Sequence, residues 1–356
     1  MKKILVVDDS ALMRKIFSDV LKDDGRFEVA GLAKDGVEAL ELLSNTKFDA
    51  IVLDINMPKM NGIEFMEELK RKNKKEKIVI VSTDAADGAE ITIRALELGA
   101  FDFIQKPKNT LDAKQGDFKQ TFIRLVYAAA DAKEHNVKSI VKEEAPAKLD
   151  DRLIETVRKK STGTTKKIVA IASSTGGPNA LQRVIPFLPG DLDAPVMIVQ
   201  HMPAGFTNSL AERLDTLSKL SVKEAKEGDQ ITKGNVYIAK GGQHMKYSKD
   251  RGAGHIVLSD EPPREGVKPC ANYMFESLVD SDYDEIVCVV LTGMGADGTA
   301  GIKELKKKKK VHVIAQEEHS CVVYGMPKAV VNNGLQNQIV ELDKIAQEIV
   351  MCTGVK

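Results

Sequence analysis

The sequence predicts an α/β protein with two doubly wound parallel sheets, one in each half of the chain. Short apolar runs alternate with amphipathic segments of helical length from residue 2 to about residue 130, and a second alternation begins at Lys167. A stretch that is rich in charge and poor in large apolar side chains separates the two patterns. The length, 356 residues, fits two domains that each bury a core.

The first pattern contains the strand candidates KILVV, FEVAGLA, FDAIVLDI, KIVIVS and FDFIQ. Amphipathic stretches lie between them and begin near Ala11, Asp35, Asn61 and Asp87. Strands that alternate with helices form parallel sheets, and such sheets bind ligands outside the carboxyl ends of their strands. The residues that follow each strand are therefore the candidates for a functional site.

Polar and charged side chains stand at those strand ends. In chain order they are Asp8, Asp9, Asp54, Ser82, Thr83 and Lys106. Carboxylates that lie close together repel one another unless a cation separates them, and oxygen ligands suit Mg²⁺. A carboxylate beside a metal ion and a lysine can also accept a phosphoryl group. A single acidic residue before a helix could be only an N-cap, but that role does not explain the whole set.

With these residues, segment 1–125 resembles a response-regulator receiver domain, which has a flavodoxin-like fold. The resemblance implies that Asp54 is the phosphorylation site and that Lys106 pairs with the phosphoryl group. The Mg²⁺ ligands that it implies are Asp8, Asp9, Asp54 and the backbone carbonyl of Asn56. The switch residues that it implies are the aromatic residue Phe103 and a hydroxyl residue, for which Ser82 is preferred to Thr83 because it directly follows the apolar strand.

Residues 129–165 are expected to form a charged linker between a first domain, residues 1–128, and a second domain, residues 166–356. Part of this linker, LDDRLIETVRKK, has an apolar residue at every fourth position, which is typical of a short amphipathic helix. The STGTT sequence that follows is expected to be a flexible hinge.

The second pattern predicts the strands KIVAIAS, APVMIVQ, VKEA, NVYIA, HIVLS, EIVCVVLTG and VHVIAQ. Helices are expected from about Pro178, over GFTNSLAERLDTL, and from near Thr299.

The Gly-rich turn SSTGGP follows the first of these strands. It matches neither the Walker pattern G-x-x-x-x-G-K-[ST] nor the dinucleotide pattern G-x-G-x-x-G, so a phosphate or nucleotide site has weak support. A strained strand-to-helix elbow that presents a nucleophile needs small residues two positions before and after it. Ser174 has Ala172 and Gly176 at these positions, whereas Ser173 has β-branched residues at both. Ser174 is therefore the candidate nucleophile, with a helix N-cap as its alternative role.

A nucleophilic serine needs a base, and the base needs a group that orients it. His201 stands at the end of the strand APVMIVQ, and Asp297 lies in the loop after EIVCVVLTG. Because the carboxyl ends of parallel strands share one edge of a sheet, Ser174, His201 and Asp297 can meet as a triad. His244 and His319 lie in expected loops and remain possible bases.

The motifs SSTGG, QHMPAGFT, LTGMGADG and SCVVYGMP make residues 167–350 similar to the catalytic domain of the CheB family of chemotaxis protein-glutamate methylesterases. A receiver, a linker and an esterase domain are the architecture of that family. The resemblance assigns Ser174 as nucleophile, His201 as base and Asp297 as the orienting residue.

The same resemblance implies that Thr175 and Met294 line the oxyanion site. Three residues depart from the usual pattern: Ser173, where alanine is common, Lys240, where proline is common, and Asn272, where aspartate is frequent.

In function, the resemblance implies a phosphorylation-regulated hydrolase that demethylates glutamate methyl esters of methyl-accepting chemoreceptors and deamidates specific receptor glutamines. It implies a chemotaxis histidine kinase as phosphodonor, Mg²⁺ for phosphorylation of the receiver and no cofactor for hydrolysis. The alternative is a phosphorylation-controlled binding module whose esterase fold is catalytically silent.

Composition excludes other classes. Lys and Arg total 52, as do Asp and Glu, and the run LKKKKK at residues 305–310 fits a solvated helix end, so nucleic-acid binding is not expected. The four cysteines form no Cys-x-x-Cys pair, which disfavours zinc and a disulfide framework. The apolar run in MKKILVVDDS is too short for a signal peptide, and no stretch is long enough to span a membrane. These features predict a cytoplasmic protein without membrane insertion.

Overall fold

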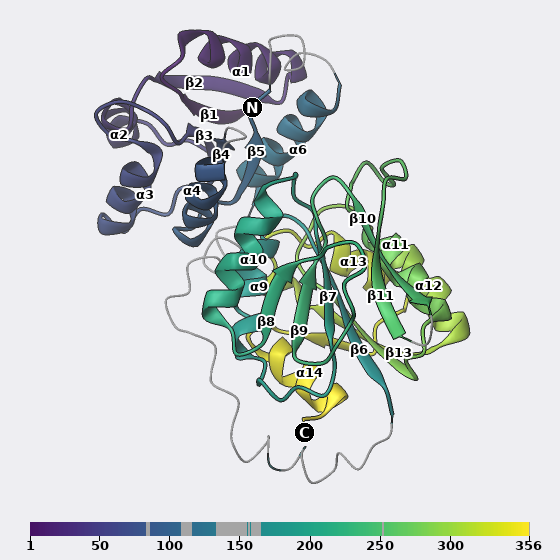
Figure 1. Ribbon diagram of the computed structural model, residues 1–356. Helices are drawn as coiled ribbons and strands as arrows, with labels where there is room; N and C mark the ends of the chain where they lie inside the picture. Colours follow the sequence, from purple (N-terminus) through teal and green to yellow (C-terminus); the bar gives the residue numbers. More distant parts are fainter. Residues whose placement is uncertain are drawn as a thin grey trace. The chain divides into compact units, whose positions relative to one another are not determined.

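Figure 1 shows the computed structural model of the chain. It describes residues 1–82, 86–107, 116–132, 155, 157, 165–250 and 253–355. The chain divides into two compact units, Met1–Val141 and Lys142–Lys356. Most of the expected linker, including most of the expected short helix and of the STGTT hinge, lies outside the described residues.

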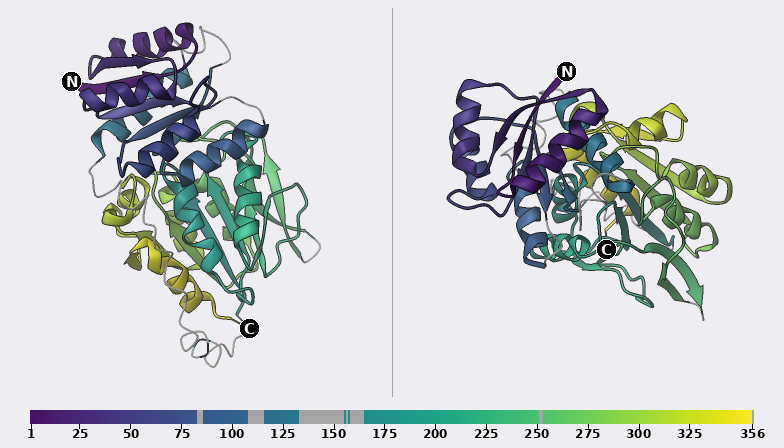
Figure 2. Two further views of the ribbon diagram at one scale, coloured as in Figure 1. Left: turned by 90° about the vertical axis from the view of Figure 1, so that its left-hand side faces the viewer. Right: turned by 90° about the horizontal axis from the view of Figure 1, so that it is seen from above.

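The described residues of the first unit form a five-stranded parallel sheet in the order β2-β1-β3-β4-β5, with helices between the strands (Figures 1 and 2). Because the chain reverses its direction of winding between β1 and β3, the carboxyl ends of these two strands flank a crevice. The elements are β1 Lys2–Val7, α1 Ala11–Asp24, β2 Phe27–Ala33, α2 Gly36–Asn45, β3 Ala50–Asp54, α3 Gly62–Arg71, β4 Ile78–Ser82, α4 Ala86–Glu97, β5 Asp102–Gln105 and α6 Asp117–Asp131.

Side-chain caps fix the starts of three of these helices. Ser10 accepts a hydrogen bond from the Met13 N–H before α1, and Asp35 accepts one from the Glu38 N–H at α2. Asn61 forms a reciprocal capping box at the start of α3. The helix starts expected near Ala11, Asp35 and Asn61 therefore lie within one residue of the observed ones.

The described residues of the second unit form a seven-stranded sheet in the order β14-β13-β12-β6-β7-β9-β8, in which every pairing is parallel. Helices α9 and α10 lie on one face of this sheet, and α11 and α12 on the other (Figures 1 and 2). The elements are β6 Lys167–Ser173, α9 Gly177–Gln182, η1 Ile185–Phe187, β7 Val196–Gln200, α10 Phe206–Leu217, β8 Ser221–Glu224, β9 Asn235–Ile238, β10 His244–Asp250, β11 Ala253–Ser259, α11 Ala271–Ser277, η2 Leu278–Asp280, β12 Glu285–Val290, α12 Thr299–Lys308, β13 Lys310–Gln316, η3 Glu318–Ser320, α13 Met326–Asn332, β14 Gln338–Val340, η4 Leu342–Lys344 and α14 Ile345–Thr353.

The central strands explain why the sequence reads as continuous apolar runs. β6, β7 and β12 are buried along almost their whole length, because helices cover both faces of a parallel sheet. On one face Ala170 and Ala172 join a cluster that includes Phe275 and Ile302 from α11 and α12. The core therefore holds three neighbouring strand ends in fixed positions.

The segment HIVLS lies outside this sheet. It is part of β11, which pairs with β10 in a separate antiparallel hairpin. One end of the hairpin carries His244, opposite Ser259 in the register.

The lysine run lies at the end of α12, as expected. Lys308 is the last residue of the helix, where positive charge meets the negative end of the helix dipole. Lys306 donates a hydrogen bond to the Leu335 carbonyl, and Lys309 donates to the Ser281 carbonyl. These contacts give the lysines structural partners. No helix in the described part of the chain has the length and apolarity needed to cross a membrane.

Candidate active site

Three adjacent strands bring the predicted triad residues to one edge of the larger sheet. Ser173 pairs with Gln200 at the ends of β6 and β7, and the His201 N–H donates to the Ser173 carbonyl at 3.0 Å. On the other side of β6, β12 leads into the loop that carries Asp297. Ser174 and His201 therefore directly follow neighbouring paired residues.

The two candidate serines differ in what their hydroxyl groups do. Ser173 is fully buried, and its Oγ donates a hydrogen bond to Gln200 Oε1 at 2.7 Å. Ser174 is half-buried, and its Oγ has no hydrogen-bond partner among the described residues. The Ser174 backbone is held firmly, because its N–H donates to the Thr292 carbonyl and its carbonyl accepts from the Gly177 N–H. Of these two serines, Ser174 is the one that combines a fixed backbone with a hydroxyl that has no partner among the described residues.

The turn after Ser174 depends on glycine. Gly176 has a φ of +76°, and a Cβ there would lie 2.5 Å from Val322 Cγ2. The left-handed backbone of the expected elbow thus lies at Gly176 and not at the serine, since the described non-glycine residues with positive φ are Lys59, Asn73 and Glu265. The requirement for a small residue two positions after Ser174 has a steric origin in this contact.

His201 and Asp297 are hydrogen-bonded to each other. His201 Nε2 lies 2.7 Å from Asp297 Oδ2, and the two side chains are 9% and 3% exposed. His201 Nδ1 has no hydrogen-bond partner among the described residues, so it is the ring nitrogen left to exchange a proton. Burial raises the pKa of Asp297, but hydrogen bonds from His201, Cys270 and the Ala271 N–H outweigh it, and the pKa lies below its ordinary value.

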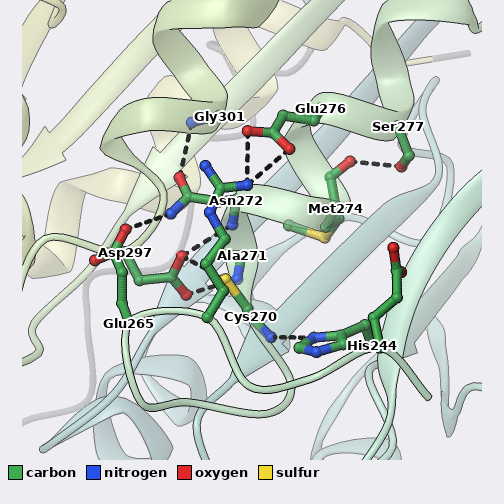
Figure 3. Close-up of polar contacts among 12 residues, drawn as sticks. His244, Glu265, Cys270, Ala271, Asn272, Met274, Glu276, Ser277, Asp297 and Gly301 are labelled. Carbon is green, nitrogen blue, oxygen red and sulfur yellow. Dashed lines mark hydrogen bonds and ion pairs between the residues drawn. The ribbon is translucent and has the colours of Figure 1, made fainter. Parts of the chain in front are cut away.

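Asp297 accepts an unusually full set of hydrogen bonds (Figure 3). Its Oδ2 accepts from the Ala271 N–H at 2.6 Å as well as from His201. Its Oδ1 accepts from Cys270 Sγ at 3.0 Å, the Asn272 N–H at 2.9 Å and the Gly298 N–H at 2.8 Å. Three consecutive residues, 270–272, therefore fix the orientation of the carboxylate.

Asn272 also ties this segment to α12 and to a neighbouring loop. Its Oδ1 accepts from the Gly298 N–H at 3.1 Å and the Gly301 N–H at 2.7 Å, and its Nδ2 donates to Glu265 Oε1 at 2.7 Å. Its amide thus caps the start of α12 while its own N–H holds Asp297. An aspartate at this position would keep the oxygen that accepts from the Gly298 and Gly301 N–H groups. Its second oxygen would face the Glu265 carboxylate and be repelled by it.

Backbone N–H groups of Thr175 and Met294 stand beside Ser174 without acceptors among the described residues. Gly293 packs directly on the serine, since a Cβ on Gly293 would lie 2.7 Å from Ser174 Cβ. Thr292 joins the two loops, because its Oγ1 donates to the Thr175 carbonyl at 2.9 Å. Backbone N–H groups that have no acceptor among the described residues and lie beside a candidate nucleophile are what an oxyanion site requires.

The two alternative bases lie elsewhere. His319 is exposed in η3. His244 is fully buried, and its ring contacts the Cys270 N–H and the Pro262 carbonyl. Among the described residues, neither histidine has a hydrogen bond to Ser174 or Asp297.

The first unit holds a second polar cluster, at the ends of β1, β3 and β5. Lys106 Nζ lies 2.7 Å from Asp54 Oδ2 and 2.9 Å from Asp8 Oδ2. Carboxylate oxygens of Asp8, Asp9 and Asp54 lie within 4.8 Å of one another. Burial raises the pKa of Asp54, and Lys106 and the Asn56 N–H oppose this rise without cancelling it. Three clustered carboxylates with one lysine fit a hard divalent cation such as Mg²⁺.

The expected switch residues lie around this cluster. Ser82 is buried, and its Oγ accepts a hydrogen bond from Thr92 Oγ1 at 2.8 Å. Phe103 is 7% exposed, so its ring is inside the unit in this structure. Thr83 lies outside the described residues.

Fold and geometry together define the class of protein: a receiver domain joined to an α/β domain in which Ser174, His201 and Asp297 follow neighbouring strands of one parallel sheet. Comparisons with known proteins agree. The family model described as response regulator receiver domain matches residues 4–114, and the one described as CheB methylesterase matches residues 169–349. The chain belongs to the CheB methylesterase family.

The relatives span the whole chain. A protein-glutamate methylesterase/protein-glutamine glutaminase from Bacillus subtilis is 43% identical, over 99% of this chain and 98% of that protein. A protein of the same description from Pyrococcus horikoshii is 38% identical, over 98% of this chain and 92% of its own length. The crystal structure of the Thermotoga maritima CheB methylesterase catalytic domain superposes with a TM-score of 0.51 and 39% identity, covering 53% of this chain and 100% of that domain.

Proposed function

We propose that this protein is a phosphorylation-regulated hydrolase that removes methyl groups from glutamate methyl esters of chemoreceptors and deamidates specific receptor glutamines. The observation that carries the proposal is the buried His201–Asp297 hydrogen bond. Among the described residues it leaves His201 Nδ1 without a partner, at the strand end next to the one that leads to Ser174. The printed descriptions of the relatives name the same two activities.

In the proposed first step, His201 Nδ1 takes the proton of Ser174 Oγ as that oxygen attacks the γ-carbonyl carbon of the ester. Asp297 keeps the proton on His201 Nε2 and stabilises the imidazolium that forms. The N–H groups of Thr175 and Met294 donate to the oxyanion, which is worth about 10²–10³ in rate for each donor.

The ester C–O bond then breaks, and methanol leaves with the proton from His201. Water attacks the resulting acyl-enzyme and gives a proton to His201. The bond between the acyl carbon and Ser174 Oγ then breaks, His201 returns the proton to Ser174 Oγ, and glutamate is released. A glutamine side chain offers the same carbonyl with ammonia as leaving group, so one site serves both reactions.

The silent binding module has less support. A fold that had lost catalysis would have no reason to keep five hydrogen-bond donors on Asp297. Mass spectrometry of a receptor segment that carries both a glutamate methyl ester and a glutamine separates the cases. We expect both side chains to become glutamate with the wild-type protein, whereas a binding module would leave both unchanged.

Regulation is assigned to the first unit. Asp8, Asp9, Asp54 and the backbone carbonyl of Asn56 would hold Mg²⁺, which offsets the negative charge of the carboxylates and of an incoming phosphoryl group. The Asp54 carboxylate would then attack the phosphorus of a phosphohistidine, the P–N bond would break with its electron pair going to the imidazole nitrogen of the donor, and Lys106 would pair with the transferred phosphoryl oxygens. A chemotaxis histidine kinase is the proposed phosphodonor.

Asp54→Ala is expected to abolish both phosphate incorporation and the increase in ester hydrolysis that a small phosphodonor with Mg²⁺ produces. The reason is that the variant lacks the carboxylate that Lys106 contacts at the end of β3. Radiolabelled acetyl phosphate measures incorporation, and Glu41→Gln, at an exposed acidic residue of α2, is the control. Incorporation at the wild-type rate in Asp54→Ala would assign the phosphoryl group to another residue.

A further inference from the structure

His244 has a contact that the catalytic steps do not use. Figure 3 shows its ring beside Cys270, the first of the three consecutive residues that hold Asp297. The Cys270 N–H donates to His244 Nδ1 at 3.1 Å. His244 therefore contacts the segment 270–272, and that segment contacts the carboxylate of Asp297.

These contacts fix the protonation state of the His244 ring. Because Nδ1 accepts a hydrogen bond from an N–H group, it must carry a lone pair and no proton. The proton then lies on Nε2, which donates to the Pro262 carbonyl at 3.2 Å. The ring is completely buried and packs on Tyr273, with 4.6 Å between the ring centroids, so it cannot turn to exchange its nitrogens without disturbing α11.

We propose that His244 is a positioning residue for the triad: while its ring is neutral it holds residues 270–272 against Asp297, and protonation of the ring releases that segment and lowers catalysis. The inference rests on the proposed function of Ser174, His201 and Asp297.

The physical reason is a clash of donors. A proton on His244 Nδ1 would point at the Cys270 N–H, and two donors cannot share a hydrogen bond. Either the ring or the segment must then move. The segment supplies the Ala271 and Asn272 N–H groups and the Cys270 thiol to Asp297, so a shift removes up to three hydrogen bonds from the carboxylate at once. The His201 imidazolium would lose its fixed partner.

The surroundings of His244 favour the neutral ring. Burial lowers its pKa from the ordinary value of 6.5, and the positive charge of Lys268 lowers the pKa further. The Pro262 carbonyl and Glu261 act in the opposite direction without cancelling the shift. Because the folded state has the lower pKa, this group contributes its full stability above about pH 6.5, and that contribution falls as the pH drops towards the folded pKa.

Two substitutions in the full-length protein distinguish the loss of the hydrogen-bond acceptor for the Cys270 N–H from the loss of a side chain that can be protonated. His244→Asn places Oδ1 near the position of Nδ1, so it keeps an acceptor for the Cys270 N–H but cannot take up a proton. His244→Leu removes the acceptor. His255→Asn is the matched control, because His255 lies on the partner strand β11 of the same hairpin.

Initial rates of ester hydrolysis as a function of pH are the first measurement. In mildly alkaline solution we expect His244→Leu to lower kcat by roughly 10–100-fold with KM unchanged within about twofold. We expect the kcat of His244→Asn to stay close to that of wild type in this range. At acidic pH, where kcat falls as the pH drops, we expect the fall in His244→Asn to depend on one proton fewer than in wild type. A His244→Leu kcat equal to that of His255→Asn, or an acid limb of His244→Asn identical to wild type, would overturn the proposal.

Hydrogen exchange of the amides at residues 270–272 is the second measurement, and it needs no activity and no His244→Leu protein. Compared at the same acidic pH, these amides should exchange more slowly in His244→Asn than in wild type. Equal exchange would contradict the proposal. Absence of hydrolysis by wild type would instead count against the proposed function, and the exchange comparison would still decide the role of His244.

Discussion

Ser174→Ala should abolish ester hydrolysis, whereas Ser173→Ala should retain most of it. Within the part of the chain that the structure describes, Ser174 Oγ and the nearby N–H groups of Thr175 and Met294 have no hydrogen-bond partner. Ser173 Oγ is buried and already donates to Gln200. Steady-state rates on a methylated receptor segment, with circular dichroism to check folding, measure both variants.

The two adjacent serines form a matched pair, because each substitution removes one oxygen from the same turn. Loss of the Ser173 hydroxyl removes the donor that Gln200 Oε1 has in the described structure, which costs about 1–3 kcal/mol of stability but removes no reacting atom. A fluorophosphonate that labels active serines should react with wild type and Ser173→Ala and fail to react with Ser174→Ala. An inactive Ser173→Ala beside an active Ser174→Ala would contradict the assignment of Ser174 and would identify Ser173 as the nucleophile.

Asp297→Asn should lower the rate of hydrolysis by about 10⁴, because an asparagine cannot hold His201 in the tautomer that leaves Nδ1 unprotonated. The measurement is kcat on the same ester, with Asp280→Asn, at an exposed acidic residue of the same unit, as the control. A loss of less than about tenfold would remove Asp297 from the proposed triad.

The structure adds a second consequence of that substitution. Both carboxylate oxygens of Asp297 accept hydrogen bonds, so an amide NH₂ group in either position faces N–H donors. We expect Asp297→Asn to lose about 1–3 kcal/mol in the unfolding free energy of the second unit. Urea unfolding followed by circular dichroism measures the difference from Asp280→Asn.

The two parallel sheets were predictable from the sequence because their strands are buried on both faces. β3 and β6 appear as unbroken apolar runs, and the helices between strands begin at residues with capping side chains. The β10–β11 hairpin was not predicted as a separate unit. Its strands carry charged residues such as Lys246 and Asp250, and the length of such a segment does not indicate which strand it pairs with.

The positions of the strand ends also predicted which residues could come together at the candidate site, and they explain which residues the sequence did not indicate. Ser174, His201 and Asp297 follow strands of one sheet, and strand ends converge by geometry alone. The donors at residues 270–272 and the ring of His244 come from a loop and from the hairpin, outside that sheet. No periodicity or motif connects Cys270 to an aspartate that lies 27 positions further along the chain.

The most direct test of methylesterase activity is to measure the methanol that the protein releases from a methylated substrate. The full-length protein is incubated with a methylated chemoreceptor fragment, with and without a small phosphodonor and Mg²⁺, and the methanol released is quantified. We expect steady release by wild type, faster release with the phosphodonor, and none by Ser174→Ala. A folded wild-type protein that binds the fragment and releases no methanol under either condition would contradict the account.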